Sequence, residues 1–273
     1  IVNNGVITSG LATATSLDSV VSGSGAFIKE GAGTLTLNAS TTYAGGTTIN
    51  AGTLEIGGSG VLQDGSYAGA IANSGTFEYN SSSDQTMSGV ISGAGALVKD
   101  NTGTLTLTGA NTYTGTASFT NALAQTFTGS TVIEGGTLQL GYGATVGTVV
   151  GDVAIAAGAT LAVNSIYDVT LANKIIGEGN VQQAGMGVLT LTGANTYTGQ
   201  TIVNGGTIRL LANATAATSA LGANTGDLVV GATAITGGTF DLNGFSLTRG
   251  RVIGTTAAGV IINSGSAASV LTV

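Results

Sequence analysis

The 273-residue chain contains no cysteine, no histidine, no proline and no tryptophan, and only 7% of its residues are charged. Without cysteine it forms neither a disulfide framework nor thiolate metal ligands, which suits export as an unfolded chain. Without histidine it has no imidazole ligand, no Ser-His or Cys-His pair and no histidine acid or base. These absences remove the commonest catalytic and metal centres, and no metal or cofactor is expected.

Long apolar runs and basic clusters are also missing. Gly, Thr, Ser or Asn interrupts every apolar stretch before the roughly 18 residues that a membrane helix needs, so the chain itself is not expected to be membrane-inserted. Six basic residues stand against 13 acidic ones, and Arg249 and Arg251 are the one close basic pair, so nucleic acid is not an expected partner. The first residues lack a signal-peptide pattern and the last stop within a strand-like pattern, so we expect a segment of a longer protein.

What the chain has in quantity is glycine, at 47 residues, and hydrophobic residues, at 42%. Their regular spacing argues against disorder. One phrase is repeated over residues 33–56, 103–140 and 187–210, the last reading GVLTLTGANTYTGQTIVNGGTIRL. The middle copy contains 14 extra residues, 117–130 (ASFTNALAQTFTGS), and without them the copies recur every 70 residues. An eroded fourth copy is expected over residues 251–273.

Within each copy, aliphatic and polar residues alternate, as in TLTL at 34–37 and 104–107. This alternation predicts short strands with one buried face, separated by glycine corners such as NAG, EGG and NGG. Coils of about 20 to 25 residues built in this way predict an all-β, parallel β-helix (β-solenoid) of about a dozen coils, as a single unit over residues 1–273. A β-sandwich is the alternative, but it requires two-residue hairpin turns and does not explain the long period. The insertion is expected to leave one corner as a surface loop.

The phrase G-x-LTLTGANTYTG-x-T-x-V-x-x-GTL-x-L resembles the passenger-associated transport repeat of type V autotransporters, which are surface and secreted proteins of Gram-negative bacteria. Residues 187–210 carry it, as do residues 33–56 with TTYAG in place of NTYTG, and residues 103–140 around the insertion. The resemblance implies an extracellular, right-handed β-helical passenger domain. It further implies a C-terminal outer-membrane β-barrel outside this sequence, and a role in adhesion, autoaggregation or biofilm formation. The implied partners are other copies of the chain, a host surface or a polysaccharide.

Tyr43, Tyr113 and Tyr197 recur at one repeat position and are a candidate aromatic ladder. If the three rings are exposed, such a ladder can stack on sugar rings. In the alternative, the three tyrosines form a column that is packed within or beside a corner of the coil. A second set of candidates lies in the insertion, which is the one strongly distinctive loop.

The candidate contact residues of the insertion are Phe119, Asn121, Gln125 and Phe127. If they bind a partner, the chain is an adhesin. If no loop does so, the chain is a structural stalk that presents another domain.

The 13 acidic residues are scattered singly along the chain. Glu55, Gln139 and Arg209 occupy one equivalent outward position in the three copies, and a catalytic carboxylate is not expected to be exchanged for an amide and a base. The chain is therefore predicted not to be an enzyme, with a polysaccharide-degrading enzyme as a minor alternative. Rows of outward threonines, as in TLTLT at 104–108, leave ice binding as another minor alternative.

Overall fold

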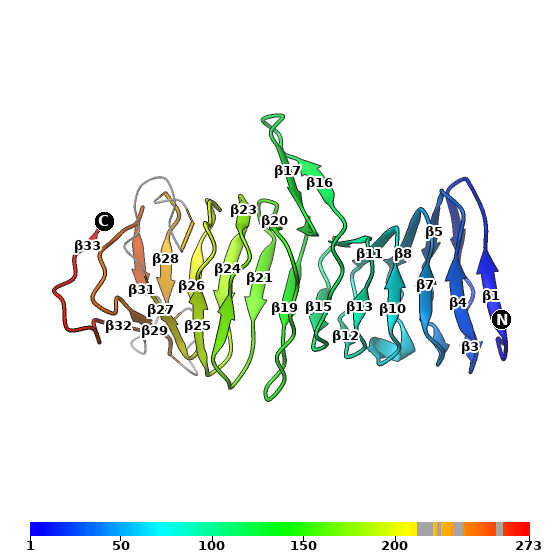
Figure 1. Cartoon of the computed structure of the whole chain (residues 1–273), viewed down its shortest axis with the longest axis horizontal. Coiled ribbons are helices and arrows are strands. Elements are labelled where there is room, and N and C mark those ends of the chain that lie inside the picture. Colours follow the sequence, from blue (N-terminus) through cyan, green and yellow to red (C-terminus); the bar gives the residue numbers. More distant parts are fainter. Residues whose placement is uncertain (212–220, 223–224, 232–236, 255–258) are drawn as a thin grey trace. The chain divides into compact units, whose positions relative to one another are not determined.

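The computed structural model describes residues 1–211, 221–222, 225–231, 237–254 and 259–273. It divides into two compact units, unit 1 (Ile1–Leu138 with Gly147–Gly151) and unit 2 (Gln139–Val146 with Asp152–Val273). In both units the chain winds through short parallel strands, and the described residues include one short 3-10 turn, Gln63–Gly65. Each unit is a parallel β-solenoid, with about a dozen turns in the two together (Figure 1). This confirms the all-β solenoid and contradicts the sandwich.

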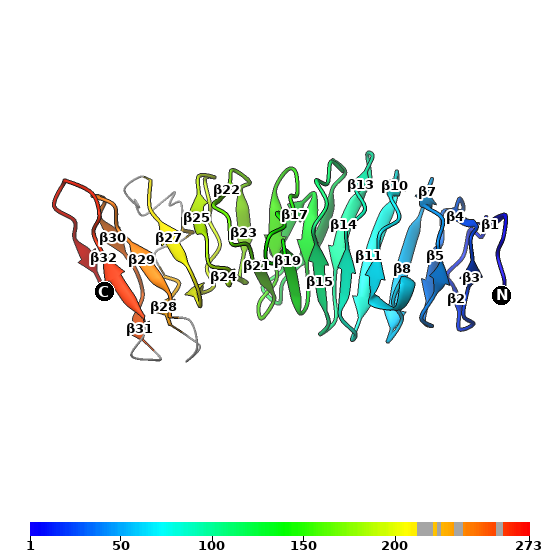
Figure 2. The same cartoon turned by 90° about the horizontal axis from the view of Figure 1, so that it is seen from below.

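Three parallel sheets form the walls of unit 1 (Figure 2). The first contains β1 (Val6–Ser9), β4 (Ala26–Lys29), β7 (Thr47–Ile49), β10 (Ile71–Asn73) and β13 (Ile91–Ser92). The second contains β2 (Thr15–Leu17), β5 (Thr34–Leu37), β8 (Thr53–Gly58), β11 (Thr76–Ser81), β14 (Ala96–Lys99) and β18 (Thr131–Ile133). The third contains β9 (Ser66–Tyr67), β12 (Gln85–Met87) and β15 (Thr104–Leu107), and the short β3 (Ser22–Gly23) and β6 (Thr42–Tyr43) pair separately.

Unit 2 is built in the same way. One wall contains β21 (Thr160–Val163), β24 (Asn180–Gln183), β26 (Thr201–Val203), β28 (Leu228–Val230) and β31 (Val252–Gly254). A second contains β22 (Val169–Leu171), β25 (Val188–Leu191), β27 (Thr207–Arg209), β29 (Thr239–Asp241) and β32 (Val260–Ile262). The remaining pairs are β20 (Val153–Ile155) with β23 (Ile175–Gly177), and β30 (Leu247–Thr248) with β33 (Leu271–Thr272), while β19 (Thr137–Leu140) contains the boundary between the units.

The core consists of columns of apolar side chains, one from each coil. In unit 1 the ladder register aligns Leu35, Leu54, Phe77 and Leu97, and each is buried. In unit 2 Leu189, Ile208 and Phe240 align in the same way, and all three are fully buried. Because strand side chains alternate between the two faces, the threonines between the leucines point away from the core. The period-two pattern of the sequence therefore predicted these walls correctly.

Glycines at the corners allow successive coils to approach closely. Gly52, Gly136 and Gly206, the last residues of NAG, EGG and NGG, all have positive φ values, of 67°, 61° and 50°. A Cβ atom at any of them would collide with carbonyl oxygens of the preceding coil. The corner therefore needs glycine for both its backbone conformation and its packing, as the sequence predicted.

Candidate functional site

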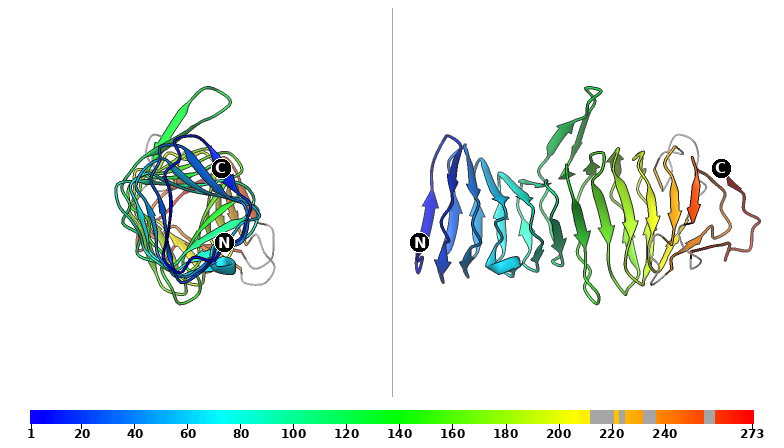
Figure 3. Two further views of the ribbon diagram at one scale, coloured as in Figure 1. Left: turned by 90° about the vertical axis from the view of Figure 1, so that its right-hand side faces the viewer. Right: turned by 180° about the vertical axis from the view of Figure 1, so that it is seen from behind.

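Residues 117–130 form a hairpin that leaves the coils of unit 1. Strands β16 (Ala117–Thr120) and β17 (Thr126–Gly129) pair antiparallel, whereas the other pairings that the structure describes are parallel. Figures 1 and 3 show the hairpin projecting outside the coils of its unit. The predicted surface loop is thus an ordered, hydrogen-bonded element that the coil carries as an outgrowth.

Two aromatic rings stack between the strands of the hairpin. Phe119 and Phe127 are partners in the antiparallel register, and their stacked rings have centroids 5.2 Å apart. Phe119 is only 8% exposed, whereas Phe127 is half-buried. The structure therefore corrects the prediction for Phe119, whose ring stabilises the hairpin from within and is not a free contact surface.

The tip of the hairpin is organised by Asn121. Its side-chain oxygen accepts hydrogen bonds from the backbone N–H groups of Leu123 (3.0 Å) and Gln125 (2.9 Å), and its Nδ2 donates to Gln125 Oε1 (3.1 Å). Asn121 thus shapes the turn, and this is a different role from the ligand contact predicted for it. Gln125 is exposed, as a contact residue must be. Leu123 is 76% exposed at the tip, and sequence analysis missed it because an isolated leucine between two alanines carries no motif.

The candidate aromatic ladder is buried. Tyr43, Tyr113 and Tyr197 each have no exposed surface, so they cannot stack on a sugar, and the packing alternative describes them. Each phenol instead bonds a buried threonine hydroxyl, at 2.8 Å in the first copy, 2.6 Å in the second and 2.7 Å in the third. Burial raises the pKa of all three phenols. The tyrosines with exposed rings are Tyr142 and Tyr167, at 68% and 55%.

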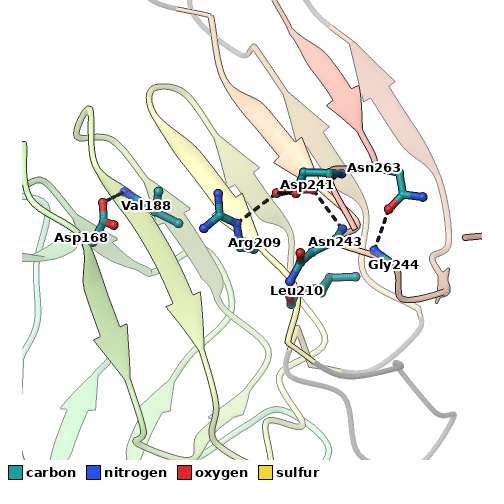
Figure 4. Close-up of polar contacts among 9 residues, drawn as sticks. Asp168, Val188, Arg209, Leu210, Asp241, Asn243, Gly244 and Asn263 are labelled. Atoms are coloured by element: carbon teal, nitrogen blue, oxygen red, sulfur yellow. Dashed lines mark hydrogen bonds and ion pairs between the residues drawn. The ribbon is translucent and has the colours of Figure 1, made fainter. Parts of the chain in front are cut away.

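The equivalent outward residues Glu55, Gln139 and Arg209 share one structural role. Each is half-buried and bonds a residue of the next coil. The bonds are Asn80 Nδ2 to Glu55 Oε1 (2.8 Å), Asn164 Nδ2 to Gln139 Oε1 (3.3 Å) and Arg209 Nε to Asp241 Oδ2 (3.0 Å; Figure 4). Acid, amide and base are interchangeable here because each can form a bond between coils.

Acids that are scattered in sequence become neighbours on unit 1. Glu78 on β11 is the direct ladder partner of Glu55 on β8. Burial, together with the charges of Glu55, Asp100 and Glu134, raises the pKa of Glu78 to about 7. Sequence analysis missed this group because the residues are neighbours only when the length of each coil is known. Within the described residues, no group of three or more His, Cys, Asp or Glu side chains is placed to hold a metal ion.

Two buried lysines were also missed. Lys29 and Lys99 are 1% and 0% exposed and occupy equivalent positions at the end of an inner strand. Lys99 Nζ donates to the carbonyl oxygens of Asp100 (2.7 Å), Asn101 (2.8 Å) and Gly135 (3.1 Å), the last on the next coil. Lys29 likewise donates to Gly31 of its own coil and to Ala51 of the next. These ammonium groups join the corner backbones of two successive coils by hydrogen bonds. Because both lysines are buried, they do not form a basic surface.

The threonine row of TLTLT at 104–108 is not an open face. Thr106 is 7% exposed, and Thr104 and Thr108 are half-buried. An ice-binding surface made of this row would need all three hydroxyl groups in solvent. In the parts of the chain that the structure describes, no helix has the length and apolarity to cross a bilayer.

Comparison with protein families supports the repeat assignment. The model for the passenger-associated-transport-repeat matches residues 27–56, 97–122, 119–140 and 181–210, which together are less than half of the chain. Each matched copy begins six residues before the corresponding repeat defined above, and the hairpin falls where two of the matches meet. The matches do not include residues 251–273, where the eroded copy stays a prediction. Comparison with curated proteins and with solved structures gives no match.

The repeat family implies secretion to the cell surface of Gram-negative bacteria. Its repeats lie here on the coils of a parallel β-solenoid, with the equivalent positions of successive copies making the same bonds between coils. The repeats and the β-solenoid fold of the chain therefore fit an autotransporter passenger domain with passenger-associated transport repeats.

Proposed function

We propose that this passenger is a non-catalytic scaffold that acts in surface adhesion, autoaggregation or biofilm formation, with the β16–β17 hairpin as its contact element. The observation that carries the proposal is the hairpin itself, an ordered outgrowth from the coils with an exposed Leu123 and Gln125 at its tip. Functional residues concentrate on loops that a rigid scaffold positions, and the hairpin has this arrangement.

The coils favour a scaffold role. The outward position of Glu55, Gln139 and Arg209 serves to bond the next coil, whatever its charge. A catalytic position needs one defined group with a pKa matched to its task. The proposal therefore places recognition on the outgrowth and stability on the repeats.

The test compares bacteria that display the native chain with bacteria that display a chain lacking residues 117–130. The deletion joins Thr116 to Thr131 and so places Thr131 four residues after Tyr113. The bonded tyrosine and threonine of the first and third copies have the same spacing. The coils are thus expected to stay folded, which protease resistance and display level will check. We expect surface binding to fall to the level of cells without the passenger.

A second variant separates the tip from the hairpin as a whole. Leu123→Ser with Gln125→Ala changes the exposed tip and retains the Phe119–Phe127 stack and the Asn121 side chain. Loss of adhesion in both variants supports contact through the tip. Unchanged surface binding by the deletion variant, at equal display, would show that the chain is a stalk for another domain.

A further inference from the structure

A second exposed surface lies on unit 2, away from any predicted motif. Tyr142, Ile166, Tyr167 and Met186 are 68%, 52%, 55% and 62% exposed. They come from three successive coils, because the N–H of Ile166 donates to the carbonyl of Gly143 (2.8 Å) and the N–H of Gly187 donates to the carbonyl of Ser165 (2.9 Å). We refer to these four residues as the apolar corner. Contiguous large apolar side chains on a soluble surface mark interaction sites.

The apolar corner is held in place by its backbone. Thr145 Oγ1 accepts a hydrogen bond from the N–H of Tyr142 (2.8 Å) and donates to its carbonyl oxygen (2.9 Å). The N–H of Thr145 also donates to that carbonyl (3.1 Å), which closes a tight turn around Gly143, whose φ is 57°. Tyr142 is therefore presented on a fixed turn, and such pre-organisation lowers the entropic cost of binding.

The same backbone occurs one repeat earlier in unit 1. Ser165 Oγ accepts from the N–H of Tyr167 (3.0 Å), as Ser81 Oγ accepts from the N–H of Ser83 (3.2 Å). Two further bonds correspond, in each of which the first N–H of a strand on the next coil donates to a carboxylate oxygen: Val188 to Asp168 (2.9 Å; Figure 4) and Thr104 to Asp84 (2.7 Å). The two corners thus have one local architecture and can be compared residue by residue.

The side chains at equivalent positions of the two corners differ in polarity. The preceding repeat has serine or threonine where the third repeat has large apolar groups; Ile166, Tyr167 and Met186 correspond to Ser82, Ser83 and Thr102. The solenoid therefore does not require apolar residues at this corner. Exposing them has no structural benefit in unit 2, so we attribute them to a contact.

Tyrosine and methionine are enriched in protein–protein interfaces, and charged residues are depleted from the centres of such interfaces. Here Asp168, which follows Tyr167 in the chain, accepts a hydrogen bond from the N–H of Val188. The chain has a net charge of −7, so two copies repel each other over most of their surface, and an uncharged apolar patch avoids this repulsion. An apolar patch is also self-complementary, as a two-fold interface requires. We propose that the apolar corner is a self-association surface that packs on the same corner of a second copy.

This surface is separate from the hairpin, so the proposal does not depend on hairpin-mediated adhesion. Four side chains cannot supply the roughly 800 Å² per partner of a standard interface, so the contact is a weak one. Weak contacts add up when many copies are displayed on one surface. The appropriate measurement in solution is therefore sedimentation equilibrium of the 273-residue chain over a wide concentration range.

The test variant carries the preceding repeat's own residues, Ile166→Ser, Tyr167→Ser and Met186→Thr. We expect the native chain to self-associate reversibly and the variant to do so at least about tenfold more weakly, because truncated aromatic anchors are the usual hot spots. The chain lacking residues 117–130 serves as the control, and its self-association should equal that of the native chain. Equal urea-unfolding midpoints will verify that the variant is folded.

A second experiment leaves the apolar corner intact. The chain has no cysteine, so Ala144→Cys, which is exposed beside Tyr142, reports directly on contact between copies. Ala68→Cys, an exposed alanine on unit 1, is the matched control. Faster disulfide dimer formation at position 144 supports the proposal. A monomeric native chain at every concentration, equal association of the variant, equal cross-linking at both positions, or a monomer that binds a polysaccharide through this corner would each overturn it.

Discussion

The phenolic oxygen of Tyr113 lies 2.6 Å from Thr131 Oγ1, although 18 residues separate them in the chain. The corresponding pairs, Tyr43 with Thr47 and Tyr197 with Thr201, are separated by only four residues. The hairpin accounts for the difference, since it is inserted between Tyr113 and Thr131 and the bond closes beneath it. The coil therefore keeps its internal geometry while it carries an outgrowth.

This bond leads to a prediction about stability. Tyr113→Phe leaves the buried Thr131 hydroxyl without its phenolic partner, and we expect it to lower the free energy of unfolding by about 1–2 kcal/mol. Adding Thr131→Val removes the second polar group, so the double variant should lose less than the sum of the two single losses. Urea unfolding followed by circular dichroism measures the three variants. Strictly additive losses would show that the two hydroxyl groups do not interact.

The acids of unit 1 predict a dependence of stability on pH. Burial and the charges of Glu55, Asp100 and Glu134 raise the pKa of Glu78 to about 7, from a usual value of 4.5. Between these two pH values the folded chain binds the proton more strongly than the unfolded chain does, so this group's contribution to stability falls as pH rises from about 4.5 to 7. Glu78→Gln should reduce that fall, as measured by urea midpoints at pH 5 and pH 7.5. Glu30→Gln, an exposed change outside this group, is the control; an equal fall in both variants would contradict the prediction.

Asp241 in unit 2 has the opposite dependence. Burial acts to raise its pKa, but hydrogen bonds from Ser264, together with those from Arg209 and Asn243 that Figure 4 shows, outweigh this effect and the pKa is lowered. A carboxylate with a lowered pKa stabilises the fold above its unfolded pKa, and that stabilisation is lost as pH falls through the folded pKa.

Asp241→Asn should therefore cost about 1–3 kcal/mol at pH 7, where the native carboxylate is charged, and much less at pH 3. The partner Arg209 is 41% exposed and stays solvated after the change, which keeps the loss moderate. Urea unfolding at the two pH values measures both quantities. The same loss at pH 3 and pH 7 would mean that the charge of Asp241 makes no contribution.

Some of these features could be read from the sequence and others could not. The column of Leu35 and Leu54 was predictable, because alternation with threonine defines a strand with one buried face. The outgrowth was predictable as a surface loop because the two other copies lack residues 117–130, whereas its antiparallel pairing was not. Burial of Tyr113 was not, since a tyrosine has an apolar ring that favours the core and a hydroxyl group that favours water. The hydrogen bond to the buried Thr131 hydroxyl satisfies the phenol inside the core, and Thr131 lies next to Tyr113 only in the folded coil.

The charged residues show the same limit. Glu55 and Glu78 are 23 positions apart and become direct neighbours because one coil has that length. Lys99 reads as a surface residue by composition alone. Its burial depends on three carbonyl oxygens that point to one place at a corner, and this is a property of the backbone that side-chain patterns do not report.

The buried Lys99 provides a last prediction, based on a comparison inside the chain. The third repeat has Gln183 at the equivalent position, 1% exposed, and its Nε2 donates to the carbonyl oxygens of Gly185 (3.2 Å) and Gly187 (2.7 Å). An amide can therefore replace the ammonium group as a donor at this corner. We expect Lys99→Gln to cost about 1 kcal/mol and Lys99→Met, which has a similar length but no donor, to cost about 2–3 kcal/mol. Urea unfolding of both variants measures the difference, and equal losses would show that the side chain acts through packing alone and not through its hydrogen bonds to the corner.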